Sequence, residues 1–187
     1  QESYKIFKQA TSHRRFGALP QAIGETWRII EAYLFYLVEL GKIKPGENDT
    51  AFSRFRMARF INEMPLFSRD KRGMNIPILI FQVLSLIYNK RYDAAIDRME
   101  AIEKYCSRYL RRDDTFRSNC FIKMLLVIPA QGFHKTAVLR HAEKYQKMLL
   151  SMPIDMANQS HDIEIIPYED LWEMALESLL DKTHKKK

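Results

Sequence analysis

The sequence predicts an all-α protein in which antiparallel helix hairpins stack as a short solenoid array, with a C-terminal capping helix. The 187 residues include only 6 Gly and 7 Pro, too few for the many tight turns of a sheet protein. The apolar residues recur at three- and four-residue steps over long segments, as they do in amphipathic helices. Because 47% of the residues are hydrophobic, the chain can bury a substantial core. We therefore expect few or no strands.

The first part of the chain predicts three helices. Residues 2–15 are expected to form a short helix, and the apolar spacing within residues 19–40 predicts a long helix that ends at a Gly- and Pro-containing segment. Thr50 can cap a third helix over residues 50–63, which Pro65 then stops.

The centre of the expected core is the segment Ile76 to Tyr88, which is apolar nearly all round. In a water-soluble α protein such a helix is surrounded by other helices. Its 13 residues are too few to span a membrane, which takes about 20. The next helix, residues 92–110, carries a single apolar stripe and follows after a tight connection.

The rest of the chain predicts helices over residues 114–128 and 134–152, the first of which stops at Pro129. We interpret residues 1–152 as one domain of helix hairpins. The segments that follow it are a connecting loop over 153–167, an amphipathic helix over 168–181 that packs on the same domain, and a basic tail over 182–187. Since the chain starts at Gln1 rather than Met, it is interpreted as a candidate fragment of a longer protein.

The predicted helices pair in sequence order. The three expected hairpins join 19–40 with 50–63, 74–89 with 92–110, and 114–128 with 134–152. Their second helices start near positions 50, 92 and 134, a period of about 42 residues that is typical of helical solenoid units.

One hairpin resembles a tetratricopeptide-like (TPR-like) helical repeat, most clearly over residues 86–102. In that family the second helix starts with an aromatic residue and continues with Ala, a bulky apolar residue and a small or apolar residue at fixed steps. Here Tyr92, Ala95, Met99 and Ile102 occupy these places. The resemblance implies a protein-binding scaffold whose concave face is lined by the first helix of each hairpin.

The sequence carries none of the short motifs that mark common catalytic sites: it lacks a P-loop, a nucleophile elbow, a zinc-protease helix motif and a dinucleotide glycine pattern. His134 and His141 lie seven residues apart, a poor spacing for a shared metal. The two cysteines, Cys106 and Cys120, are expected to be reduced and buried. We expect a non-catalytic protein without cofactor or metal.

The charge distribution raises the alternative of nucleic-acid binding. Residues 1–161 hold 26 basic and 16 acidic side chains, whereas residues 162–181 hold seven acidic side chains and no basic one. In the segment 52–60, Arg54, Arg56 and Arg59 alternate with phenylalanines, a pattern that stacks bases and holds phosphates on an exposed surface. On a helix the same rings would instead pack into the core with the arginines at its edge, and we prefer that interpretation.

Trp172 lies on the apolar face of the acidic C-terminal helix. We expect this helix to cap the last hairpin. The alternative is a detachable ligand mimic, which Trp172 docks in the groove until a partner displaces it. The sequence thus predicts a cytoplasmic protein-interaction or scaffolding module with a protein or peptide partner and no membrane contact. The alternative function is a nucleic-acid-associated regulatory domain that uses the basic loops and the 52–60 helix.

Overall fold

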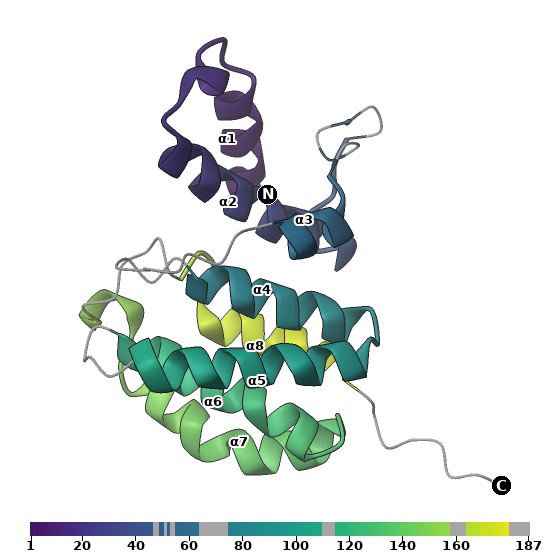
Figure 1. Cartoon of the computed structure of the whole chain (residues 1–187), viewed down its shortest axis with the longest axis vertical. Coiled ribbons are helices and arrows are strands. Elements are labelled where there is room, and N and C mark those ends of the chain that lie inside the picture. Colours follow the sequence, from purple (N-terminus) through teal and green to yellow (C-terminus); the bar gives the residue numbers. More distant parts are fainter. Residues whose placement is uncertain are drawn as a thin grey trace, which may run out of the picture. The chain divides into compact units, whose positions relative to one another are not determined.

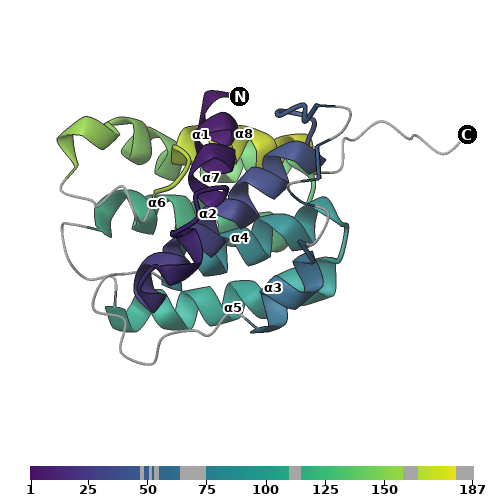
Figure 2. The same cartoon turned by 90° about the horizontal axis from the view of Figure 1, so that it is seen from above.

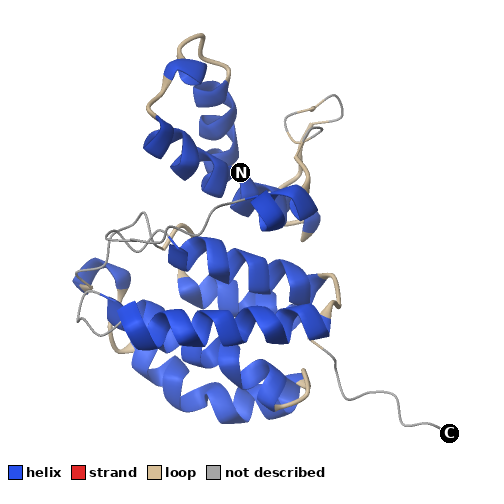
Figure 3. Cartoon of the chain, in the orientation of Figure 1, coloured by secondary structure: helices blue, strands red, loops and turns tan. Residues whose placement is uncertain are grey.

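The regular secondary structure of the described part of the chain is entirely helical. The computed structural model describes residues 1–46, 49, 50, 52, 55–63, 75–109, 115–157 and 164–179. Helices and their connections account for these residues, and no strand occurs among them (Figure 3). The predicted all-α class is confirmed over this part of the chain. Within it, no helix is both long enough and apolar enough to cross a lipid bilayer.

The chain divides into two compact units, Gln1–Leu66 (unit 1) and Phe67–Lys187 (unit 2). This division differs from the expected single domain over residues 1–152. The expected connecting loop, over 153–167, lies inside unit 2, as does the C-terminal helix.

Unit 1 is built around the side chains of its first two α-helices. Its elements are α1 (Glu2–Thr11), the 3-10 helix η1 (Phe16–Ala18), α2 (Gln21–Glu39) and α3 (Met57–Glu63). Tyr4 and Phe7 of α1 form a buried cluster with Leu34 of α2 and with Ile43, which follows α2. Both views show α1 lying against α2 (Figures 1 and 2).

The chain reverses sharply after α2, at Gly41. The Gly41 N–H donates to the Val38 carbonyl and the Lys42 N–H to the Leu37 carbonyl, which is the Schellman pattern at a helix end. Gly41 has φ +70°, a value at which a side chain is strained. The Gln1 side chain donates to the Lys44 carbonyl at 3.0 Å, so the reversed segment is attached to the start of α1.

The third helix is shorter than predicted: α3 begins at Met57 rather than near Thr50. The Phe55 N–H donates to the Phe52 carbonyl in a turn, and the Phe52 ring stacks on Tyr4 with 5.5 Å between ring centroids. Stacking against α1 therefore overrides the helical spacing in this segment, and the expected 52–60 helix is wrong for its first part.

Unit 2 contains five α-helices among its described residues. They are α4 (Asn75–Tyr88), α5 (Tyr92–Tyr109), α6 (Phe116–Ala130), α7 (Lys135–Leu150) and α8 (Tyr168–Glu177), with the 3-10 helix η3 (Ile154–Met156) between the last two. From α4 to α7 each helix packs against the next one, and α8 packs against α4, α6 and α7 (Figure 1).

Helix α4 lies in the core, as the sequence predicts, because every residue from Asn75 to Ile87 is buried. Helix α6 ends at Ala130, two residues further than expected, and includes Pro129. A proline this close to the end of a helix disturbs few backbone hydrogen bonds, and the helix stops instead at Gly132, which has φ +57°.

Candidate functional site

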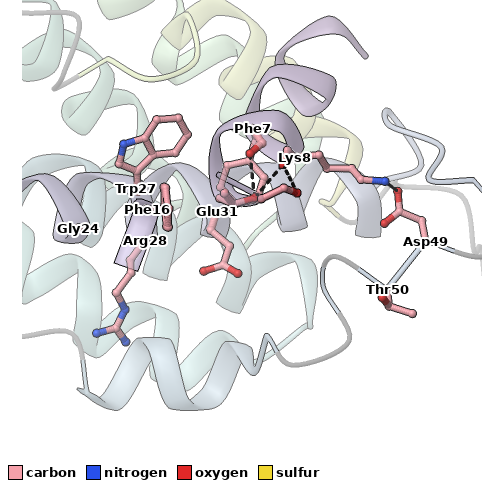
Figure 4. Close-up of a pocket in the computed structure, with 11 residues that line it drawn as sticks. Phe7, Lys8, Phe16, Gly24, Trp27, Arg28, Glu31, Asp49 and Thr50 are labelled. Atoms are coloured by element: carbon pink, nitrogen blue, oxygen red, sulfur yellow. Dashed lines mark hydrogen bonds and ion pairs between the residues drawn. The ribbon is translucent and has the colours of Figure 1, made fainter. Parts of the chain in front are cut away.

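A pocket of about 440 Å³ opens in unit 1 between α1, the first half of α2 and the segment 49–50 (Figure 4). This volume falls within the range of small-ligand pockets, about 300 to 1,000 Å³. The lining residues are Phe7, Lys8, Thr11, Ser12, Phe16, Gly24, Trp27, Arg28, Glu31, Asp49 and Thr50.

Three aromatic rings form one wall of the pocket. The Trp27 ring lies 5.9 Å from the Phe7 ring and 5.5 Å from the Phe16 ring, measured between centroids. The Phe16 and Trp27 planes meet at 78°, so the edge of one ring faces the other. Phe7 is buried in the α1–α2 core, whereas Phe16 and Trp27 are half-buried, which leaves part of their surface to a ligand.

An ion pair lies on the side of the pocket away from Trp27 (Figure 4). Lys8 Nζ contacts Asp49 Oδ2 at 2.7 Å, and the Asp49 side chain is only 6% exposed. Burial raises the pKa of Tyr4 above its ordinary value, and the neighbouring Asp49 carboxylate raises it further. The Lys8–Asp49 pair therefore joins α1 to the segment that follows α2, and its two charges neutralise each other.

Glu31 is a carboxylate without a partner at the pocket. It is half-buried, and it forms no hydrogen bond or ion pair with another described residue. Burial raises the pKa of Glu31, and the charge of Arg28 acts in the opposite direction. Arg28 is itself exposed to solvent. The pocket thus holds a negative group that has lost part of its hydration and gained no direct cation.

Gly24 lines the pocket on the α2 side. In the interior of a helix, glycine is about 0.5–1 kcal/mol less favourable than alanine. A Cβ atom added to Gly24 would meet nothing within 4 Å, so no neighbour requires a glycine there.

A second polar constellation lies inside unit 2, around Arg117 of α6. Its Nε donates to Glu164 Oε2 at 2.9 Å, and its Nη2 donates to Glu164 Oε1 and to Glu169 Oε2, each at 2.7 Å. The Nη1 group donates to the carbonyls of Leu149 and Met152. Arg117 is 1% exposed. Its burial acts to lower its pKa, but the hydrogen bonds and charges of the two glutamates outweigh that effect and raise the pKa.

The Arg117 cluster is structural, because its hydrogen-bonding groups are directed at the chain itself. Glu164 Oε1 also accepts the Tyr168 N–H at 2.8 Å, at the start of α8. The Tyr168 ring stacks on Phe121 with 4.5 Å between centroids, and its hydroxyl shares a hydrogen bond with Ser118. Together these contacts hold α8 against α6.

No protein family, curated protein or solved structure matches the chain. The similarity to TPR-like repeats over residues 86–102 therefore stays a prediction.

The arginines singled out in the sequence are placed apart from the pocket lining. Arg54 lies outside the described residues, and Arg56 and Arg59 are exposed at α3. The Arg56 guanidinium donates to the Phe55 carbonyl at 3.1 Å. The Phe55 ring packs on Phe35 with 4.7 Å between centroids. Phe60 is buried, whereas Phe52 and Phe55 are half-buried and precede α3, so core packing of all these rings on one helix stays a prediction.

Trp172 lies on the buried face of α8 and is 1% exposed. Its indole Nε1 has no hydrogen-bond partner among the described residues. A role for Trp172 in binding a partner stays a prediction. The basic tail over 182–187 lies outside the described residues.

Among the described residues, no group of three or more His, Cys, Asp and Glu side chains is arranged to hold a metal ion. His141 Nδ1 lies 2.8 Å from the Ala137 carbonyl on its own helix.

Sequence reasoning missed both Glu31 and Arg117, although each had a signal. Gly24 interrupts a helical pattern seven residues before Glu31, on the same face of the helix, and an isolated glycine in a helix commonly has a packing or functional reason. Arg117 stands at helical spacing from Phe121, Met124 and Ile128, on the buried stripe of α6.

Proposed function

We propose that the chain is a non-catalytic protein-interaction module, in which the pocket of unit 1 receives a side chain of a partner polypeptide. The observation that carries this proposal is a pocket of about 440 Å³ with a wall of three aromatic rings, two of which are half-buried. Partner side chains that contribute most to protein–protein affinity bind in such pockets, surrounded by groups that exclude water.

Unit 2 serves as the scaffold in this proposal. The pairs α4–α5 and α6–α7 act as two helix hairpins of a short TPR-like array, and α8 acts as its cap. The support is that successive helices pack on one another and that α8 contacts three of them. The buried cluster around Arg117 further supports a cap that stays in place. If α8 separated from α6, the Arg117 guanidinium would lose its two carboxylate partners, Glu164 and Glu169, which is unfavourable for a buried cation.

A pocket-filling substitution tests the proposal. Peptides selected from a random library on the immobilised full chain would be measured again on two variants, Gly24→Ala and Gly24→Phe. The alanine adds only a methyl group in open space, whereas the phenylalanine adds a large ring at a residue that lines the pocket. We expect binding to persist in Gly24→Ala and to be lost in Gly24→Phe, with both variants showing the same helical circular dichroism. The proposal fails if no peptide is enriched or if both variants bind equally.

The exposure of Arg56, just before α3, and of Arg59 on α3 supports a second candidate, a nucleic-acid-associated regulator. This candidate is tested by measuring how the affinity for single- and double-stranded oligonucleotides depends on salt concentration. Each phosphate contact makes the fall of log affinity with log salt concentration steeper. Changing Arg54, Arg56 and Arg59 together to glutamine reduces that slope if this candidate is correct. Binding that depends only on the basic tail over 182–187 contradicts it.

A further inference from the structure

The charges at the pocket select among possible occupants. Four of its lining residues are charged, and two of them, Lys8 and Asp49, neutralise each other at 2.7 Å. Arg28 is exposed, so water and salt screen its charge. Glu31 is the remaining group, half-buried and without a hydrogen bond or ion pair to another described residue. A positively charged group on the occupant would therefore complement the Glu31 carboxylate.

The aromatic wall has the same preference. A cation over the face of an aromatic ring is attracted by the ring's quadrupole, most strongly at tryptophan. Trp27 and Phe16 stand at 78° to each other and line the same pocket as Glu31. Rings and carboxylate together suit a group with an apolar stem and a positive end.

We propose that the occupant is the side chain of a lysine on the partner polypeptide; this inference rests on the proposed function of the pocket. The lysine methylene groups pack against Phe16 and Trp27, and the ammonium group forms a charge-assisted hydrogen bond with the Glu31 carboxylate. A purely apolar side chain would fill the same space but would further dehydrate Glu31 without a partner, which is unfavourable. An anionic side chain would be repelled by Glu31.

The probes for a test are three acetylated tripeptide amides, Gly-X-Gly, in which X is lysine, norleucine or glutamate. Norleucine matches the lysine stem without its charge. The readout is the NMR signal of the Trp27 indole N–H in the full chain, assigned by its loss in Trp27→Phe. The signal of Trp172, in the other unit, serves as an internal control for folding.

We expect the lysine peptide to shift the Trp27 signal with an affinity at least about fivefold higher than that of the norleucine peptide. In Glu31→Gln this preference disappears, because the glutamine is neutral and nearly the same size. In Arg28→Gln the lysine peptide binds as well as before or better, because a nearby positive charge has been removed.

Two results would overturn the inference and leave the proposed function standing. One is norleucine binding as well as lysine, with no effect of Glu31→Gln, which would make the pocket an apolar site. The other is preferential binding of the glutamate peptide that Arg28→Gln abolishes. If no probe shifts the Trp27 signal, the lysine assignment also fails, and the library experiment with the Gly24 variants then decides separately whether the pocket binds peptides at all.

Discussion

Arg117 and Glu164 meet in the interior of unit 2 through two parallel hydrogen bonds of 2.9 and 2.7 Å. Both residues are nearly inaccessible to water, at 1% and 3% exposure. A buried ion pair adds little to stability when compared with apolar residues of the same shape, but removing one partner leaves an uncompensated charge in the core. The pair is therefore a position at which a single substitution has a large effect.

We expect Arg117→Met to reduce the free energy of unfolding of unit 2 by about 3–5 kcal/mol. The measurement is urea denaturation of the full chain in a Trp27→Phe background, where Trp172 fluorescence reports unit 2 alone. The double variant Arg117→Met/Glu164→Leu should recover part of this loss, because the buried carboxylate goes as well. The matched surface control is Lys147→Met, which breaks the exposed Lys147–Glu143 ion pair and should leave the midpoint unchanged. A loss below about 1 kcal/mol in Arg117→Met would show that the cluster is not required.

Glu31 makes the stability of unit 1 depend on pH. Its pKa is raised in the folded chain, so the folded state binds the proton more tightly than the unfolded state does. The unfolding free energy that Glu31 contributes therefore falls as pH rises from the unfolded pKa through the folded pKa. We expect Glu31→Gln to be more stable than the parent chain at neutral pH, with the difference shrinking on acidification. Thermal unfolding of both chains between pH 4 and pH 7.5 measures this, and a constant difference across that range would contradict it.

Gly24→Ala should stabilise α2 by about 0.5–1 kcal/mol, because alanine loses less backbone entropy than glycine in a helix. The new methyl group meets no atom within 4 Å, so no clash offsets the gain. The midpoint of thermal unfolding should rise. The comparison variant is Gly41→Ala, which should be destabilised because its φ of +70° strains a side chain. If the two substitutions changed the midpoint by the same amount and in the same direction, backbone conformation would not explain the effect of alanine at either glycine.

Cys120 is expected to resist alkylation in the folded chain. Burial raises the pKa of its thiol, although Lys123 and Arg117 act in the opposite direction, and the residue is 2% exposed. Thiolate is the reactive form, so little of it is available at pH 7.5. Mass spectrometry of the Cys120 peptide after iodoacetamide treatment should show modification only once urea unfolds unit 2. Rapid labelling of the native chain would indicate that α6 opens locally.

Deletion of residues 162–187 separates a capping role for α8 from the role of a detachable ligand mimic. The deletion removes both carboxylate partners of Arg117 and uncovers the parts of α4, α6 and α7 that α8 contacts. We expect unit 2 of the shortened chain to lose its cooperative unfolding transition in circular dichroism. An unchanged cooperative transition would instead support the detachable helix.

Much of the helical structure follows from local sequence patterns. The all-round apolar segment becomes the buried helix α4, and the single stripe starting at Tyr92 becomes α5. These predictions succeed because periodicity reports which face of a helix is buried, whatever the partner.

Features that depend on distant contacts did not follow from those patterns. Phe52 has helical spacing, yet it stacks on Tyr4 and Phe7, nearly fifty residues earlier in the chain. The pocket likewise combines residues from α1, α2 and the segment 49–50. The sequence around Glu31 does not reveal that its carboxylate forms no hydrogen bond or ion pair with another described residue. The division near Leu66 depends on which helices share contacts, which composition does not reveal.

The connections of Arg117 also constrain when unit 2 can become complete during synthesis. Its guanidinium donates to oxygen atoms that lie between 32 and 52 residues further along the chain. Contacts of such separation form only after the intervening loop has closed, and a chain emerging from the ribosome reaches Glu169 last. Arg117 therefore has its full set of hydrogen-bond partners only after the chain has been made as far as α8.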